Sequence, residues 1–324
     1  MAFVQSREKP NMTEREWLAS DDPAAMLHWA SGRDGSPPIH GYGDRKLRLF
    51  ACACCRICWR LLADTRSRRA VEVSERFADG EATAEELQHA EIDVVYAASS
   101  SDSVAWVRGL PCNACELTVN CPQMVQRAAR GGIQPATQAA LLRDIIGNPF
   151  RPVRVADDLD DFAGIHQGLT RRHLVPTVVA LAEAAYTERP ERKCKQCCDG
   201  QQMIKEWREG LGICGIGQKA CGYCHGTGTI ADGRLDPVRL AVLADALEDA
   251  GCDREELLRH LRGEELCPRC EGTKVYDDIA GEDLDGRGGY LCTVACEECS
   301  GGWRSLRGPH VRGCWVLDLL LGKE

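Results

Sequence analysis

Two cysteine units, at residues 194–224 and 267–299, constrain the fold of this chain more than any other feature of its sequence. Each unit contains a C-x-x-C pair, a spacer and a second C-x-x-C pair. Two such pairs bring four thiolates to one ion and complete the tetrahedral shell that Zn²⁺ prefers, with Zn–S bonds of about 2.3 Å. The sequence therefore predicts two zinc ions, bound by Cys194, Cys197, Cys221, Cys224, Cys267, Cys270, Cys296 and Cys299.

The predicted role of both ions is structural, because four thiolate ligands leave no coordination position for water or a substrate. The two units resemble each other, so we interpret them as an internal repeat in which each unit closes its own site. Exchange of cysteine pairs between the units is the alternative. We expect a backbone with positive φ after each pair, at Gly200, Gly226, Gly272 and Gly301.

The composition favours a soluble protein of the reducing cytoplasm. The apolar share of 44% and the charged share of 27% are typical of globular proteins. The N-terminal sequence lacks the apolar core of a signal peptide, so the 20 cysteines are expected to be reduced thiols and metal ligands. No apolar run is long enough for a membrane helix. The net charge of −9 argues against general attraction to nucleic-acid phosphates, and protein partners are favoured.

The remaining sequence predicts a mainly α-helical body with two small inserted modules, each a four-cysteine zinc-knuckle and β-hairpin unit. Helix starts are indicated by the Thr13–Glu16 and Thr83–Glu86 capping boxes, by Asp-Pro pairs at 22–23 and 236–237, and by a cap at Asp253. The predicted divisions are a flexible extension at 1–12, a helical domain at 13–190, zinc module 1 at 191–233, a helical pair at 234–263, zinc module 2 at 264–307, and a C-terminal segment at 308–324 that packs on the body.

Residues 44–62 are expected to form one core helix with an apolar face and an opposite face carrying Arg45, Arg48, Arg56 and Arg60. These arginines form either a solvated face paired with acidic neighbours or a contact surface for phosphate or a partner. The helix also carries Cys52, Cys54, Cys55 and Cys58. We expect these cysteines to pack in the core, because buried free cysteine is common there, and metal binding is the alternative.

Three further cysteines, Cys112, Cys115 and Cys121, form a C-x-x-C pair with a third thiol. They could form a third metal site, completed by a cysteine of the 44–62 helix. A redox role would require a thioredoxin-like setting, which the surrounding sequence does not show. Cys198, Cys214 and Cys292 lie near the zinc ligands and are expected to be spare thiols or small packing residues, and substitution for one of the ligands is the alternative.

Several segments resemble a bacterial family for which no activity is established, among them RKLRLFACACCR, LADALEDAGC and HVRGCWVLDLLLGKE. Separately, CGYCHGTG, CPRCEGT and CEECSGG resemble the C-x-x-C-x-G-x-G repeats of the DnaJ cysteine-rich region. Only CGYCHGTG matches that repeat completely, and no HPD tripeptide of a J-domain is present. The second resemblance implies a zinc module that binds unfolded proteins.

The function expected from these patterns is that of a non-enzymatic zinc-binding protein that serves as an interaction or adaptor module. The sequence contains no phosphate loop, no GxSxG elbow and no HExxH motif, so no catalytic constellation is identified. One alternative is nucleic-acid binding through the zinc modules and the arginine-rich helix. Another is a DnaJ-like chaperone or a thiol-disulfide protein.

Overall fold

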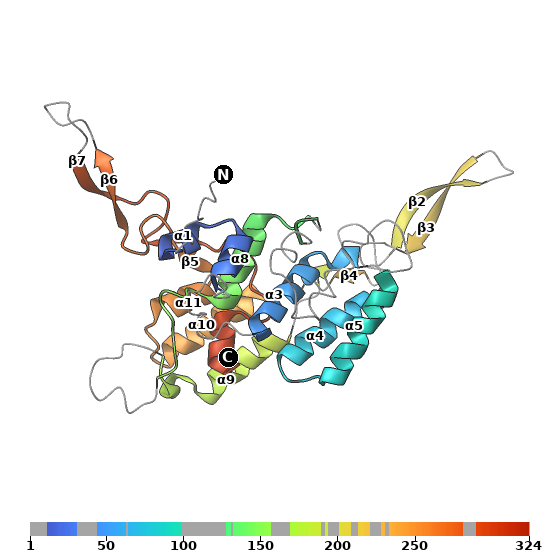
Figure 1. Cartoon of the computed structure of the whole chain (residues 1–324), viewed down its shortest axis with the longest axis horizontal. Helices are drawn as coiled ribbons and strands as arrows, with labels where there is room; N and C mark the ends of the chain where they lie inside the picture. Colours follow the sequence, from blue (N-terminus) through green and yellow to red (C-terminus); the bar gives the residue numbers. More distant parts are fainter. Residues whose placement is uncertain are drawn as a thin grey trace, which may run out of the picture.

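The computed structural model describes residues 12–30, 44–62, 64–98, 128–130, 132–156, 169–188, 192–193, 201–208, 213–220, 228–230, 233–280 and 290–323. This part of the chain is mainly α-helical, as predicted. Its helices form a central body, from which two β-hairpins extend in different directions (Figure 1). None of the described helices is long and apolar enough to cross a membrane.

The first core of the body lies around the helix predicted at 44–62, which is buried among three other helices. Its largest buried side chains include Trp17, Met26, Phe50 and Leu142. The four helices are α1 (Glu14–Ala19), α2 (Pro23–Ala30), α3 (Asp44–Ile57) and α8 (Pro135–Ile146). The capping box of Thr13 and Glu16 is confirmed, because each side chain accepts a hydrogen bond from the backbone of the other residue.

The second core contains the helices on either side of the two inserted modules. Leucine and alanine side chains of α10 pack in one cluster with residues of α9 and α11, and Leu240, Leu243 and Leu247 are fully buried. The helices of this core are α9 (Pro176–Thr187), α10 (Pro237–Asp249), α11 (Glu255–Leu261) and α12 (Trp315–Leu321). A short 3-10 helix, η3 (Arg171–His173), precedes α9.

A helical pair, α4 (Thr65–Ala78) and α5 (Ala84–Ala98), packs beside α3. Its own small core contains Ala70, Val73, Leu87 and Val94. The predicted capping box of Thr83 and Glu86 is confirmed by two hydrogen bonds, of 3.0 and 3.2 Å.

The described strands form four antiparallel pairs. The pairs are β1 (Arg192–Lys193) with β4 (Thr229–Ile230), β2 (Gln201–Arg208) with β3 (Ile213–Ala220), β5 (Glu264–Leu266) with β8 (Trp303–Ser305), and β6 (Val275–Ala280) with β7 (Tyr290–Ala295). In each inserted module, the first and last strands form a short pair next to the body, and the two strands between them form a longer hairpin that extends away from it (Figure 1).

Two helix boundaries differ from the sequence-based expectation. The helix predicted over 44–62 ends at Ile57 and continues as a 3-10 turn, η1 (Trp59–Leu61), in which the Leu61 N–H donates to the carbonyl of Cys58. The predicted cap at Asp253 is wrong. The first backbone bonds of α11 run from Leu257 and Leu258 to the carbonyl of Arg254, so the N-cap lies one residue later.

A buried ionic cluster attaches the C-terminal helix to α3. The guanidinium of Arg45 donates to both carboxylate oxygens of Asp318, at 2.7 and 2.9 Å. The ammonium of Lys46 pairs with the same carboxylate and donates to the carbonyls of Ile145 and Gly313. Since the Lys46 and Asp318 side chains are both buried, each depends on the other for compensation of its charge.

We predict that Asp318→Asn lowers the free energy of unfolding by about 3–5 kcal/mol, because it leaves the Lys46 ammonium buried without its carboxylate. Denaturant titration followed by circular dichroism measures this loss. Asp245→Asn is the control, since Asp245 pairs with Arg262 on the surface and is expected to change stability by less than about 1 kcal/mol. Equal losses in the two variants would contradict the prediction.

Candidate metal centres

The second cysteine unit brings its four predicted ligands together. Cys267 and Cys270 follow β5, while Cys296 and Cys299 follow β7. Their four sulfur atoms all lie within 4.8 Å of one another. The second unit therefore collects a four-sulfur group from its own two pairs.

The distances within this group fit a tetrahedral zinc site. The Sγ atoms of Cys267 and Cys296 are 3.8 Å apart, and those of Cys270 and Cys299 are 3.6 Å apart. Four Zn–S bonds of about 2.3 Å give a tetrahedron with edges of about 3.8 Å. Burial and the neighbouring Cys296 thiol raise the pKa of Cys299 to about 12, so this thiol keeps its proton until a cation displaces it.

The backbone around the four sulfurs folds into two tight turns that face each other. Gly272 and Gly301 have φ of 86° and 63°, which confirms the predicted positive φ at both positions. At Gly302 a Cβ atom would lie 2.7 Å from the carbonyl oxygen of Gly272, so the two turns approach too closely for a side chain there. The N–H of Cys296 donates to the carbonyl of Lys274, which joins the second turn to the first.

The module is attached to the helical body through Glu265, whose side chain is 7% exposed. Its carboxylate accepts hydrogen bonds from Arg304 and Arg307 and lies 3.6 Å from the Nε atom of Arg143 in α8. Next to it, Leu266 and Trp303 pack into the first core. These ionic and apolar contacts therefore hold the strands next to the four-sulfur group against the helical body.

Several predicted ligands lie outside the described residues. They are Cys194, Cys197, Cys221 and Cys224 of the first unit and Cys112, Cys115 and Cys121 of the third candidate site. Gly200 and Gly226, for which positive φ is predicted, also lie outside the described residues. The first zinc ion and the third site stay predictions.

The predicted basic stripe on α3 does not face solvent at the positions that the structure describes. Arg48 is 3% exposed and Arg56 is 8% exposed. Arg56 donates to both carboxylate oxygens of Glu75 in α4, and Arg45 pairs with Asp79 and Asp318. The expected pairing with acidic neighbours is confirmed for Arg45 and Arg56. The expectation that this face is solvated is wrong, because α4 and α12 cover it. The side chain of Arg60 lies outside the described part.

The three cysteines of α3 and Cys58, which follows it, pack in the first core, as expected. Cys52, Cys54, Cys55 and Cys58 are each 3% exposed or less and contact the apolar residues of this core. Burial raises the pKa of Cys54 strongly, so its thiol is protonated at neutral pH.

A second group of ligand-type side chains, which the sequence analysis missed, lies inside the helical body. It consists of Asp144 in α8, His260 in α11, and His310 and Cys314 in the segment before α12; we call it the Asp144 cluster. All four residues are buried, and their ligand atoms lie within 4.8 Å of one another. The only sequence signal is the H-x-x-x-C spacing of His310 and Cys314, because Asp144 and His260 lie far away in the chain.

Electrostatic interactions in the Asp144 cluster favour an ionised carboxylate and a neutral His260. Burial alone would raise the pKa of Asp144, but His310 and His260 lie against it and the net shift is downward. Burial lowers the pKa of His260, although Asp144 opposes that shift.

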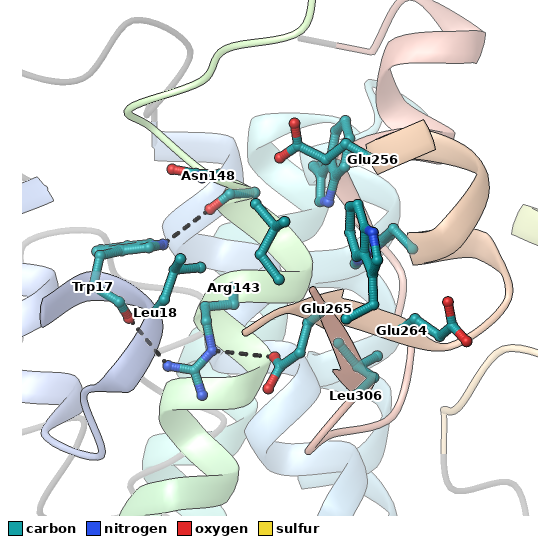
Figure 2. A pocket seen from close by; sticks show the side chains of 13 residues that line it. Trp17, Leu18, Arg143, Asn148, Glu256, Glu264, Glu265 and Leu306 are labelled. Carbon is teal, nitrogen blue, oxygen red and sulfur yellow. Dashed lines mark hydrogen bonds and ion pairs between the residues drawn. The ribbon is translucent and has the colours of Figure 1, made fainter. Parts of the chain in front are cut away.

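A pocket lies beside this cluster, between α1, α8, α11 and the base of the second module. It encloses about 410 Å³ including its mouth, and His260 belongs to its wall. Figure 2 shows Trp17, Leu18 and Arg143 on one side of the pocket, with Glu256 and Glu264 on the other. Burial lowers the pKa of Arg143 to about 10, so its guanidinium stays charged at neutral pH.

Comparison of this chain with family models, with characterised proteins and with solved structures finds no match. The two resemblances noted in the sequence therefore stay expectations, and the functional argument rests on the sites themselves.

We predict that Cys296→Ser removes about one equivalent of zinc per chain and makes the β6–β7 hairpin sensitive to proteases. The reason is that three thiolates no longer close the tetrahedral shell, while the helical body has its own cores. Elemental analysis and limited proteolysis measure the two effects. Cys292→Ser is the matched control, since this cysteine is expected to be a spare thiol, and an equal loss of zinc there would contradict the assignment.

We predict that the contribution of Glu256 to stability declines as the pH rises from about 4.5 to about 7, because burial raises the pKa of Glu256 to about 7 in the folded state. Glu256 then loses a proton at higher pH in the folded state than in the unfolded state. Glu256→Gln should remove this decline and raise the free energy of unfolding above pH 7 by about 2–3 kcal/mol, after allowance for partial solvation.

The matched control for that prediction is Glu255→Gln, because the adjacent Glu255 side chain is 62% exposed. Denaturant titrations at several pH values compare the two variants. An unchanged pH profile in Glu256→Gln would contradict the assignment.

Proposed function

We propose that this protein is a non-enzymatic zinc-binding adaptor, in which a four-cysteine zinc site holds the β6–β7 hairpin as an arm for binding another protein. The observation that carries the proposal is the place of the four-sulfur group, at the base of a hairpin that extends away from the helical body (Figure 1). Four protein thiolates form a closed shell, which suits a structural ion better than a catalytic one.

The hairpin has the properties of a recognition element. An isolated two-stranded hairpin is marginally stable in water, so an ion at its base supplies the rigidity that binding requires. Each strand pairs only with the other among the described strands, which leaves both outer edges able to pair with an extended segment of a partner. The sequence 275–289 contains five acidic residues and one arginine, so the proposed partner surface is basic.

The proposed compartment is the reducing cytoplasm. The ten cysteines whose side chains the structure describes form no disulfide with one another, and thiolate ligands must stay reduced to bind zinc.

The proposal is tested with a hairpin-shortened variant, in which residues 279–291 are replaced by Asn-Gly and all four ligands are kept. A photo-crosslinking amino acid at the exposed Thr293 of β7 identifies the partner, and the same group at the exposed Thr187 of α9 is the control. We expect a partner that is crosslinked only from Thr293, and whose affinity falls at least about tenfold in the shortened variant. Full affinity of a variant with unchanged zinc content and helicity would refute the adaptor role.

Assays on the same purified protein distinguish the adaptor role from nucleic-acid binding and from a chaperone or thiol-disulfide function. Nucleic-acid binding would give an affinity that falls steeply with salt concentration. The buried pairing of Arg45 and Arg56 removes much of the motivation for this alternative. A chaperone or thiol-disulfide protein would suppress aggregation or reduce insulin, and a positive result in either assay would replace the adaptor proposal.

A further inference from the structure

We propose that the Asp144 cluster is a second kind of zinc site, in which one carboxylate, two imidazoles and one thiolate hold an ion at the centre of the helical body. This site is separate from the cysteine units and would join α8, α11 and the segment before α12. Its ligand types are all ones that zinc uses in proteins.

The geometry of the cluster is close to a four-coordinate shell. The Nε2 atom of His260 lies 3.2 Å from Oδ1 of Asp144 and 3.4 Å from Sγ of Cys314. The Nδ1 atom of His310 lies 2.7 Å from the same Oδ1 and 3.9 Å from the same Sγ. Zinc bonds of about 2.0–2.3 Å give tetrahedral edges of about 3.3–3.8 Å. Three of the four distances fall near this range, and the His310–Asp144 pair must open by about 0.6 Å.

The charges of the proposed site sum to zero. One Zn²⁺ is balanced by the carboxylate of Asp144 and the thiolate of Cys314, and both imidazoles are neutral. Asp144 and Cys314 are fully buried, and the two histidines are each 6% exposed. An ion and ligands with no net charge suit the buried interior of the body, because an uncompensated buried charge costs several kcal/mol.

The orientation of the ligands is fixed by groups around them. The second carboxylate oxygen of Asp144, Oδ2, accepts the backbone N–H of Val311 at 2.8 Å, which directs Oδ1 toward the histidines. The ring of His260 packs 5.2 Å from Trp315 and makes an edge contact with His310. A hydrogen bond to the second oxygen of a carboxylate, such as the one from Val311, is typical of metal-ligating carboxylates.

The alternative without a metal is a hydrogen-bonded pair of Asp144 with a protonated His310. In that state the imidazolium would also carry an Nε2–H. The Nε2 atom of His310 is buried and has no hydrogen-bond partner among the described residues. A neutral His310 that binds the ion through Nδ1 carries the same Nε2–H, but an unsatisfied buried donor costs more when its ring is charged, so the protonated pair is less favourable than two neutral rings around an ion.

The test compares Cys314→Ala with Cys252→Ala in the full chain. Cys252 is the matched control, since it is a buried cysteine of the same core. Elemental analysis should show that Cys314→Ala holds about one zinc equivalent less than the wild type, and that Cys252→Ala keeps the full amount. Thermal unfolding of the helical signal should shift down more in Cys314→Ala than in the control. Equal zinc contents in all three proteins would overturn the proposal.

A second measurement covers the case in which Cys314→Ala does not fold. Zinc-edge X-ray absorption on otherwise wild-type protein should show nitrogen and oxygen donors beside sulfur. It is made in a His225→Ala background, because His225 follows a predicted ligand and could supply nitrogen itself. A spectrum with sulfur donors only, or a metal other than zinc in the folded protein, would overturn the assignment.

Discussion

The buried carboxylate of Asp144 is the constraint on which the helical body depends. It lies on α8, whose apolar residues belong to the first core, while His260 and Cys314 lie among the residues of the second core. The carboxylate also accepts the N–H of Val311, so it fixes the segment that leads into α12. A buried carboxylate must be compensated by donors or by a cation. The need to compensate it brings α8, α11 and the C-terminal segment together.

The second module is stabilised in a different way. Its described strands are short and paired only in twos, so they bury little apolar area of their own. Four cysteines at the base of β6 and β7 can supply through a metal ion the stability that a core of this size cannot. Glu265 and Trp303 then join that base to the helices. The proposed adaptor role follows from this arrangement, in which a rigid base carries an arm that extends from the body.

The arginines of α3 show where pattern reasoning fails. Arg45 and Arg56 lie opposite the apolar face of the helix, and side chains in this position are normally exposed to solvent. In the fold, Arg56 pairs with Glu75 of α4, and Arg45 pairs with Asp79 at the end of α4 and with Asp318 of α12. A helical pattern indicates which residues share a face. It does not indicate what a distant segment will place against that face.

The sequence by itself determined the features that depend on local chemistry. These include the mainly helical class, the capping boxes at Thr13 and Thr83, and the four-sulfur group at Cys267–Cys299, because caps and C-x-x-C pairs act over a few residues. Only the tertiary structure decided the Asp144 cluster, the buried arginines and the pocket beside His260. Their members are separated by up to hundreds of residues, and no spacing in the chain records a contact that forms only when helices pack.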